Sequence, residues 1–260
     1  MRHFFKLLAF IPLFAITSGL AYAGDRECGA GFLSAMARQL GIKDLRPRTD
    51  GGTLVGGACA VWSHDRHIML SAFAYDTGVA DAKTLVVATT DAKTARVLSR
   101  YTVAIEEDAT MQVDEASVRL DTARYQLSKE VTAFGVRFTS NARGVRGAEA
   151  SSNDELTLFV AEGSKLRPVM HLYMFQQKSI VGWLNSAMEE SVWENATLSI
   201  RTAKTSTNGY ADLLVTANIA PDSAGDSDKL PKPRKEHHLL RYDGTQYQRG
   251  GDAPWWIGWP

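Results

Sequence analysis

The chain has few cysteines, little proline and no excess of charge of either sign. Its 260 residues include two cysteines and eight prolines, and 29 basic residues balance 29 acidic residues. Interspersed acids and bases argue against nucleic-acid binding, which needs a clustered basic surface. After the first 23 residues, no apolar run approaches the roughly 20 residues that a membrane-spanning helix requires. The composition therefore disfavours a nucleic-acid-binding protein and a membrane anchor.

The usual catalytic signatures are also missing. The sequence contains no GxSxG, SxxK, HExxH or GxxxxGK[ST] motif. A hydrolase or phosphotransferase of a common class normally carries one of them. A triad assembled from distant positions stays open, because such triads are recognised by geometry. The sequence thus favours a protein that is not an enzyme.

Residues 1–23 have the pattern of a cleavable signal peptide. A short basic start precedes an apolar run over residues 7–20, and Ala21-Tyr22-Ala23 matches a signal-peptidase site. We expect cleavage after Ala23 and a mature periplasmic chain that begins at Gly24.

Cys28 and Cys59 are the two cysteines of the chain, and both lie after the signal sequence. An even pair in an exported protein predicts a disulfide. Two distant cysteines without CxxC spacing make a poor metal or redox motif. Cys28 also lacks the preceding small residues of a lipoprotein processing site, so we expect no lipid anchor.

The hydrophobic pattern predicts one mainly β domain over residues 24–260, with one or two short helices. Apolar residues recur at helical spacing from Phe32 to Leu40, where Gly41 provides a stop. A second helix is expected from about Ser179 to Trp193. The remaining apolar segments alternate with polar residues or form short runs between turn residues, as in strands.

The strands show weak internal repeats, at about 57–101, 116–173 and 196–250. The second and third copies share an alternating segment that ends in Thr-Ala, about 80 residues apart. Each copy reads as four antiparallel strands, with hairpin turns at Glu162-Gly163 and Asp243-Gly244. Such units predict a propeller-like stack or an irregular β-sandwich. Chance similarity between alternating strands is the alternative.

The third copy resembles a known repeat family. Asn208-Gly209-Tyr210-Ala211-Asp212-Leu213, followed by Tyr242-Asp243-Gly244 and Tyr247, is similar to FG-GAP-type repeat segments of uncharacterised exported proteobacterial β proteins. The resemblance covers about 40 residues and implies an Asp-rich loop that often binds calcium. Tyr210 stands where that family has a further aspartate, so we expect no cofactor, with calcium and zinc left open.

Three sets of side chains are candidates for a functional site. His64, Asp65 and His67 lie at a predicted strand turn and could bind zinc or act as a base, with His237 and His238 joining them. A hydrated turn is the alternative, because a metal site usually needs three or four convergent ligands. Acidic clusters at Glu106-Glu107-Asp108, Asp114-Glu115, and Glu189-Glu190 with Glu194 could supply paired carboxylates. Such runs are more often solvated.

The third set is the aromatic tail, with Trp255, Trp256 and Trp259. This tail is too apolar to stay in water, so it either folds back over the sheet or forms an exposed binding anchor. The likeliest contact residues from sequence are these three tryptophans and the loop of His64, Asp65 and His67.

The leading functional hypothesis is a non-enzymatic periplasmic protein that binds a secreted or periplasmic protein partner. An inhibitor or immunity protein that neutralises an envelope-acting toxin or hydrolase fits this pattern best. Loops on a rigid β scaffold supply a recognition surface without perturbed catalytic groups. Two alternatives stay open, a periplasmic hydrolase with a His/Asp centre and an envelope adhesion or assembly module.

Overall fold

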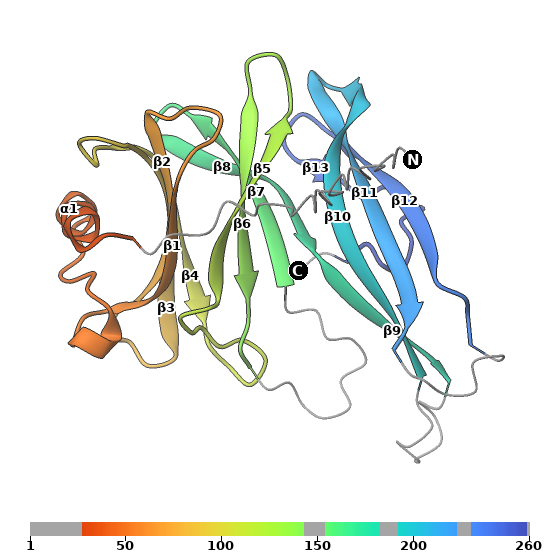
Figure 1. The fold of residues 1–260 in the computed structure, drawn as a ribbon, viewed down its shortest axis with the longest axis horizontal. Helices are drawn as coiled ribbons and strands as arrows, with labels where there is room; N and C mark the ends of the chain where they lie inside the picture. The colour runs from red at the N-terminus through yellow and green to blue at the C-terminus, as the bar shows by residue number, and fades with distance from the viewer. Residues whose placement is uncertain (1–27, 143–153, 182–191, 223–229, 259–260) are drawn as a thin grey trace, which may run out of the picture.

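The structure, a computed structural model, describes residues 28–142, 154–181, 192–222 and 230–258 (Figure 1). These residues form a mainly β protein, which confirms the predicted class. The helix α1 (Ala30–Leu40) and a short 3-10 turn (Arg48–Asp50) precede thirteen strands. The predicted signal peptide lies outside the described residues and stays a prediction. No described helix has the length and apolar character needed to cross a membrane.

Eight strands form one sheet, and five form another. The first sheet has the order β1-β2-β3-β4-β8-β7-β6-β5 and the second β13-β12-β11-β10-β9. Their bounds are β1 (Leu54–Val61), β2 (Ile68–Asp76), β3 (Ala82–Asp91), β4 (Val97–Glu106), β5 (Val118–Gln126), β6 (Thr132–Thr139), β7 (Asp154–Glu162), β8 (Lys165–Tyr173), β9 (Phe175–Val181), β10 (Val192–Thr207), β11 (Tyr210–Pro221), β12 (Arg234–Tyr242) and β13 (Tyr247–Gln248). All neighbouring strands are antiparallel except β4 and β8.

The eight-stranded sheet is folded on itself into a nearly closed barrel. Strands β1 to β4 form one half and β5 to β8 the other, and β1 comes close to β5. The approach is tight at Gly56 of β1, where an added Cβ would lie 2.4 Å from the backbone oxygen of Asp114. Only glycine leaves room for that contact. The two halves are therefore held face to face.

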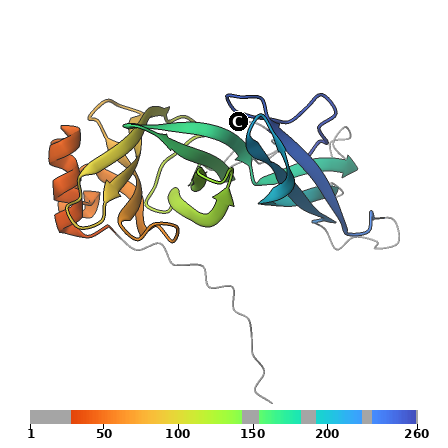
Figure 2. The ribbon, with the colours of Figure 1, turned by 90° about the horizontal axis from the view of Figure 1, so that it is seen from above.

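The elements stack in four layers, which Figures 1 and 2 show from two sides. In order, these are α1, the β1–β4 half, the β5–β8 half and the curled five-stranded sheet. The core between the two halves includes Leu70, Val87, Phe134 and Val136. The core beneath the curled sheet includes Leu156, Leu172, Leu213, Val215 and Leu240. Each half of the eight-stranded sheet therefore packs against another layer on both faces, whereas α1 and the curled sheet end the stack.

The predicted first helix and disulfide are confirmed. Helix α1 buries Leu33 and Met36 against Phe73 of β2 and Val86 of β3, and ends at Gly41, whose φ of 69° suits glycine. The Cys28–Cys59 disulfide joins Cys28, two residues before this helix begins, to β1, with a Cα–Cα distance of 5.1 Å. The helix is therefore held on its sheet both by packing and by a covalent link.

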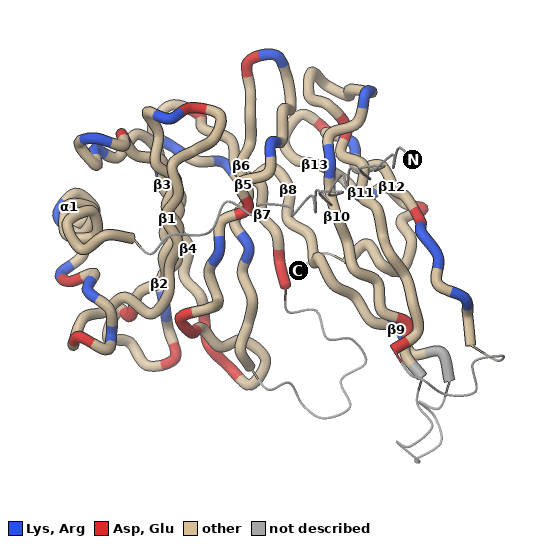
Figure 3. The backbone as a smooth tube through the Cα atoms, viewed as in Figure 1, with Lys and Arg blue, Asp and Glu red and all other residues tan. Residues whose placement is uncertain are grey.

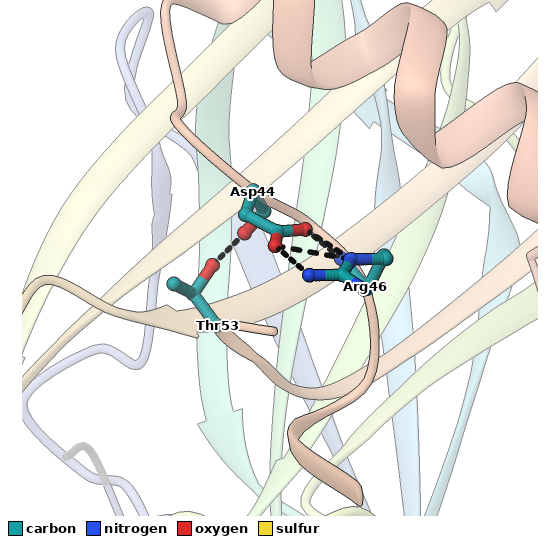
Figure 4. A network of polar contacts seen from close by, with 3 residues as sticks. All are labelled: Asp44, Arg46 and Thr53. Carbon is teal, nitrogen blue, oxygen red and sulfur yellow. Dashed lines mark hydrogen bonds and ion pairs between the residues drawn. The ribbon is translucent and has the colours of Figure 1, made fainter. Parts of the chain in front are cut away.

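A polar network fixes the connection from α1 to β1 (Figure 4). The Arg46 guanidinium donates to the Asp44 carboxylate, with Nη2 2.7 Å from Oδ2, and Thr53 Oγ1 donates to the Asp44 backbone oxygen. The Arg46 guanidinium and then the Arg46 backbone N–H hold the pKa of Asp44 below its ordinary value. The network stabilises the loop between α1 and β1. It adds nothing to the hydrophobic core, because the Arg46 side chain is mostly exposed.

The predicted repeats correspond in outline to the layers. Consecutive strands β1 to β4 and β5 to β8 each form an antiparallel meander, and β10 to β13 form a third within the curled sheet. The hairpin turns at Gly163 and Gly244 occur where the sequence placed them, with φ of 60° and 106°. The sequence left the arrangement of the units open. In the structure, two of them share one sheet through β4 and β8.

The predicted second helix is wrong at both of its ends. Ser179 belongs to β9 and Trp193 to β10, and these strands pair antiparallel through Val181 and Val192. Backbone pairing with the rest of the curled sheet overrides the local helical spacing there. Residues 182–191, the middle of that segment, lie outside the described residues. Residues 223–229, between β11 and β12, also lie outside the described residues.

Candidate functional site

The curled sheet has one buried face and one open face. Side chains alternate along a strand, so Leu198, Val215 and Leu240 point into the core and their neighbours point outward. Among the described residues, no helix or strand covers the outward side of β10, β11 and β12, which ends the stack (Figure 1). We call this outward surface the basic face. It consists of Thr197, Ser199, Arg201, Leu214, Thr216, Asn218, Lys235, His237, Leu239 and Arg241.

The charges on the basic face all have one sign. Arg201, Lys235 and Arg241 are exposed, and no aspartate or glutamate is among the ten residues. None of the three cations forms an ion pair with another described residue. Figure 3 shows basic residues recurring along β12. A near-neutral chain thus presents a locally positive surface that attracts acidic groups.

Cross-strand register places these residues in short rows. Arg201 lies beside Leu214, which pairs with Leu239, whereas Ser199 lies beside Thr216, which pairs with His237. Thr216 Oγ1 is 3.0 Å from His237 Nδ1. Leu239 is 36% exposed, one of the few large apolar side chains on the described surface. The rows place a small apolar area next to cations.

A hollow of about 400 Å³ lies at the β12 end of the basic face. Its lining includes Leu214 and Leu239, with Arg241 and Arg249 among the polar residues around them. His238 Nε2 lies 2.5 Å from the backbone oxygen of Arg249, so the segment after β13 is attached to β12 here. Asp252 also lines the hollow, so the hollow offers a small apolar contact surrounded by two arginines and one aspartate.

Ion pairs and hydrogen bonds on the opposite side of β12 hold the strands of the basic face in place. Arg234 pairs with the buried Glu194 of β10 and with Glu236, and Glu236 accepts a hydrogen bond of 2.7 Å from Trp256 Nε1. The Trp256 indole and the Arg234 guanidinium hold the pKa of Glu236 below its ordinary value. Both carboxylates raise the pKa of Arg234, so it stays charged. The face is therefore presented by strands that are fixed from beneath.

A second network joins the curled sheet to the layer below. Arg167 of β8 donates to Glu162 at 2.7 Å, to Tyr242 Oη at 3.0 Å and to the backbone oxygen of Thr245. Tyr242 stacks on Tyr210, with ring centroids 4.4 Å apart. These contacts cross from β8 to β12 and fix the angle between the two sheets.

The predicted loop of His64, Asp65 and His67 lies far from the basic face in the fold, at the turn between β1 and β2. Asp65 Oδ1 accepts a hydrogen bond of 2.9 Å from the His67 backbone N–H, which is ordinary turn geometry. His64 contacts Thr132 Oγ1 at 3.3 Å and the ring of Trp62. The three residues thus lie in a turn between β1 and β2, and their role in binding stays a prediction.

The structure does not bring the predicted histidines together. His237 and His238 lie on β12 of the curled sheet, whereas His64 and His67 belong to the other sheet. Within the described ranges, no three His, Cys, Asp or Glu side chains are grouped so as to hold a metal ion. The zinc-hydrolase interpretation therefore has no ligand set in this part of the chain.

The C-terminal tryptophans differ from one another in burial. Trp256 is completely buried beneath the curled sheet, so it cannot be the exposed anchor that the sequence proposed. Trp255 is half-buried, with Lys178 Nζ 5.8 Å from its ring centroid. Trp259 lies outside the described residues. The tail folds back over the sheet at Trp256 because burial of the large apolar ring is favourable. The one N–H of the indole costs little to bury, since it has a hydrogen-bond acceptor.

The acidic clusters serve local structure. Glu107 pairs with Lys83 and accepts from the Val113 backbone N–H, and Asp108 accepts from the N–H groups of Thr110 and Met111. Glu194 pairs with Arg234, and residues 189 and 190 lie outside the described residues. None of these contacts resembles two carboxylates set across a sugar cleft.

The aspartates of the loop implied by the FG-GAP resemblance accept hydrogen bonds from residues close to them in the chain. Asp212 is buried and accepts from Thr205 Oγ1 at 2.6 Å and Thr207 Oγ1 at 2.7 Å. Asp243 accepts from the backbone N–H groups of Thr245 and Gln246, which lowers its pKa. Both aspartates therefore stabilise turns in the structure, and the expectation of no cofactor, with calcium left open, stays a prediction.

The sequence did not single out the basic face. Its cations come from β10 and β12, more than 30 residues apart, and each lies in an alternating strand where a charged residue is ordinary. The available signal was the absence of acidic residues at every outward position, which requires the register to be known. The fold defines a mainly β protein with a nearly closed eight-stranded sheet and a curled five-stranded sheet. A scan of protein-family models and searches of curated proteins and solved structures found no match.

Proposed function

We propose that this chain is an exported, non-enzymatic protein of the periplasm that binds an acidic surface on a protein partner. The basic face is the proposed contact surface. The observation that carries the proposal is the set of exposed cations Arg201, Lys235 and Arg241 on one face, none of which forms an ion pair with another described residue. Arg241 also lines the hollow that contains Leu214 and Leu239. Export is supported by the sequence of residues 1–23 and by the Cys28–Cys59 disulfide, which is typical of oxidising compartments.

The chemistry of the face favours a protein partner over a simple polyanion. Protein interfaces have an apolar centre and a polar rim, with arginine enriched. Leu214 and Leu239 supply the apolar part and Arg241 the charged rim. A polyanion without apolar groups would leave the hollow unused. As the finer step, we propose that the partner is an envelope-acting toxin or hydrolase and that binding neutralises it.

Charge reversal on the basic face tests the proposal. The double variant Arg201→Glu/Arg241→Glu and its matched control Arg96→Glu/Arg100→Glu carry the same change in net charge. Arg96 and Arg100 are exposed and lie at the start of β4 in the other sheet. Each tagged protein is used to capture periplasmic and secreted proteins of its own host, and the partner is identified by mass spectrometry.

The wild type and the β4 control are expected to retain one partner, and the basic-face variant to bind it at least about tenfold more weakly. With the purified partner, the association rate of the wild type should fall as salt is raised from about 50 to 500 mM, because exposed charges are screened. Equal binding by all three proteins would contradict the basic face as the site. The neutralisation step is measured separately, as the partner's activity with and without the chain.

A further inference from the structure

The seam between β4 and β8 contains a cavity on the inner side of the folded sheet. These two strands run parallel, and Arg100 with Lys165 is the one pair that their described residues form. Beyond that pair, β4 continues to Glu106 and β8 to Tyr173 without a shared ladder. The opening leaves a cavity of about 640 Å³, a size typical of small-molecule sites.

The walls of this cavity are mostly apolar. The apolar side chains include Leu85, Val103, Ile105, Val136, Phe138 and Phe159. Strand β8 adds Pro168, Met170 and His171, and Gln246 and Gln248 also line the cavity. Tyr101 adds a further ring, with its centroid 5.2 Å from that of Phe159. Water in such a space contacts apolar surface on several sides, so an apolar ligand gains by displacing it.

One end of the cavity is polar. Glu155 and Thr157 of β7 lie on the same face as Phe138 and Val136, with which they pair, so they point into the space between the two halves. Glu155 Oε2 is 2.9 Å from His171 Nε2, and the Glu155 side chain is only 15% exposed. An acidic side chain on the inner face of packed sheets is unusual, because burial of a carboxylate is costly.

The charge on the lining of the cavity is negative. Glu155 is the one acidic side chain among them, and the lining contains no lysine or arginine. The His171 imidazole contacts one oxygen of Glu155 and is itself 43% exposed, so a bound ammonium group would share the carboxylate with it. Aromatic ring faces also attract cations. Carboxylate, rings and apolar walls together suit a positively charged head group on an apolar body.

We propose that this cavity binds a small amphipathic organic cation, an amine attached to an apolar chain or ring. The ammonium group lies against Glu155 and Thr157, where the carboxylate accepts its hydrogen bonds. The apolar body lies along β4, between Val103, Phe138 and Phe159. The site is separate from the basic face, so its test does not depend on the proposed partner.

Three probes with the same chain and different head groups test the proposal. Octylamine, octanoate and octanol are titrated by calorimetry into the purified wild-type protein at pH 7. Octylamine is expected to bind at least tenfold more tightly than octanoate, with octanol between them. In Glu155→Gln the advantage of the amine should fall at least tenfold while octanol binding is unchanged. Absence of octylamine binding, or an amine preference that persists in Glu155→Gln, overturns the proposal.

A second pair of variants locates the ligand. Val103→Trp fills the apolar wall and should abolish binding of all three probes. Val79→Trp makes the same change in size at a 63% exposed position between β2 and β3, outside the cavity lining, and should leave binding unchanged. Thermal unfolding shows whether each variant is folded, and if Val103→Trp does not fold, Glu155→Gln decides the question. Binding by folded Val103→Trp at the wild-type level overturns the placement in this cavity.

Discussion

Lys83 and Glu107 form an ion pair, with Nζ 2.7 Å from Oε2, although only 8% of the lysine side chain is exposed. Asp76 lies further away, at 3.8 Å from the same Nζ. The lysine joins β3 to the segment after β4, so the pair lies where the sheet turns toward its second half. A charge so deep in the protein is tolerated only because it is paired.

Removing one partner of this pair should therefore destabilise the protein strongly. Glu107→Ala leaves the Lys83 ammonium without its nearest partner and should lower the free energy of unfolding by about 3 kcal/mol. Urea denaturation measures the change. The double variant Lys83→Met/Glu107→Leu should recover part of it, because the buried ammonium is removed while the Val113 N–H still lacks its Glu107 acceptor. A loss under about 1 kcal/mol in Glu107→Ala would show that solvent or Asp76 replaces the partner.

Trp256 should be a stability residue and not a binding residue. Trp256→Ala removes a completely buried indole and should cost about 3 to 5 kcal/mol. Trp255→Ala, on a half-buried neighbour, is the comparison and should cost clearly less. Chemical denaturation of both variants tests the ranking. Similar losses at the two positions would contradict the burial that distinguishes them.

The contact between Trp256 and Glu236 also predicts that the stability of the folded protein falls at acidic pH. The Trp256 indole and then the Arg234 guanidinium lower the pKa of Glu236 in the folded protein relative to the unfolded chain. The ionised form is thus favoured by folding. Its contribution to stability is complete above the unfolded pKa of about 4.3, and is lost as the pH falls through the lower folded value.

Glu236→Gln isolates this contribution. The variant should be less stable than the wild type at pH 7, and the difference should shrink as the pH is lowered from about 5 to 3. Thermal unfolding midpoints of the two proteins across this range give the measurement. Glu130→Gln, at an exposed turn without an ion pair to a described residue, is a suitable control. A difference that is constant with pH would show that Glu236 is not the titrating group.

The disulfide should contribute mainly through the unfolded chain. Cys28 and Cys59 are separated by 31 residues, and closing such a loop stabilises by about 3 to 4 kcal/mol in the chain-entropy model. Cys28→Ala/Cys59→Ala should lower the free energy of unfolding by that amount, as urea denaturation of both proteins would show. The helix α1 should loosen first, which hydrogen exchange of residues 30–40 would detect. Uniform exchange would contradict this order.

Local features of the fold could be predicted from the sequence because their causes are local. Helix α1 follows from apolar spacing and Gly41, and the turns at Gly163 and Gly244 follow from residues that accept a positive φ. The disulfide followed from the even pair of cysteines. The second expected helix was wrong at its ends, because the pairing of β9 with β10 is a contact between segments that the local pattern does not describe.

The sequence by itself determined that this is a mainly β protein with one early helix, one disulfide and repeated antiparallel strands. Alternation and turn residues act within a few positions, so they are visible in the chain. Only the tertiary structure decided that Trp256 is buried and that Arg201 and Arg241 share one open face. It also decided that Glu155 lines a cavity. Each of these depends on which layer covers which face of a strand, and that choice is made by the packing of distant segments.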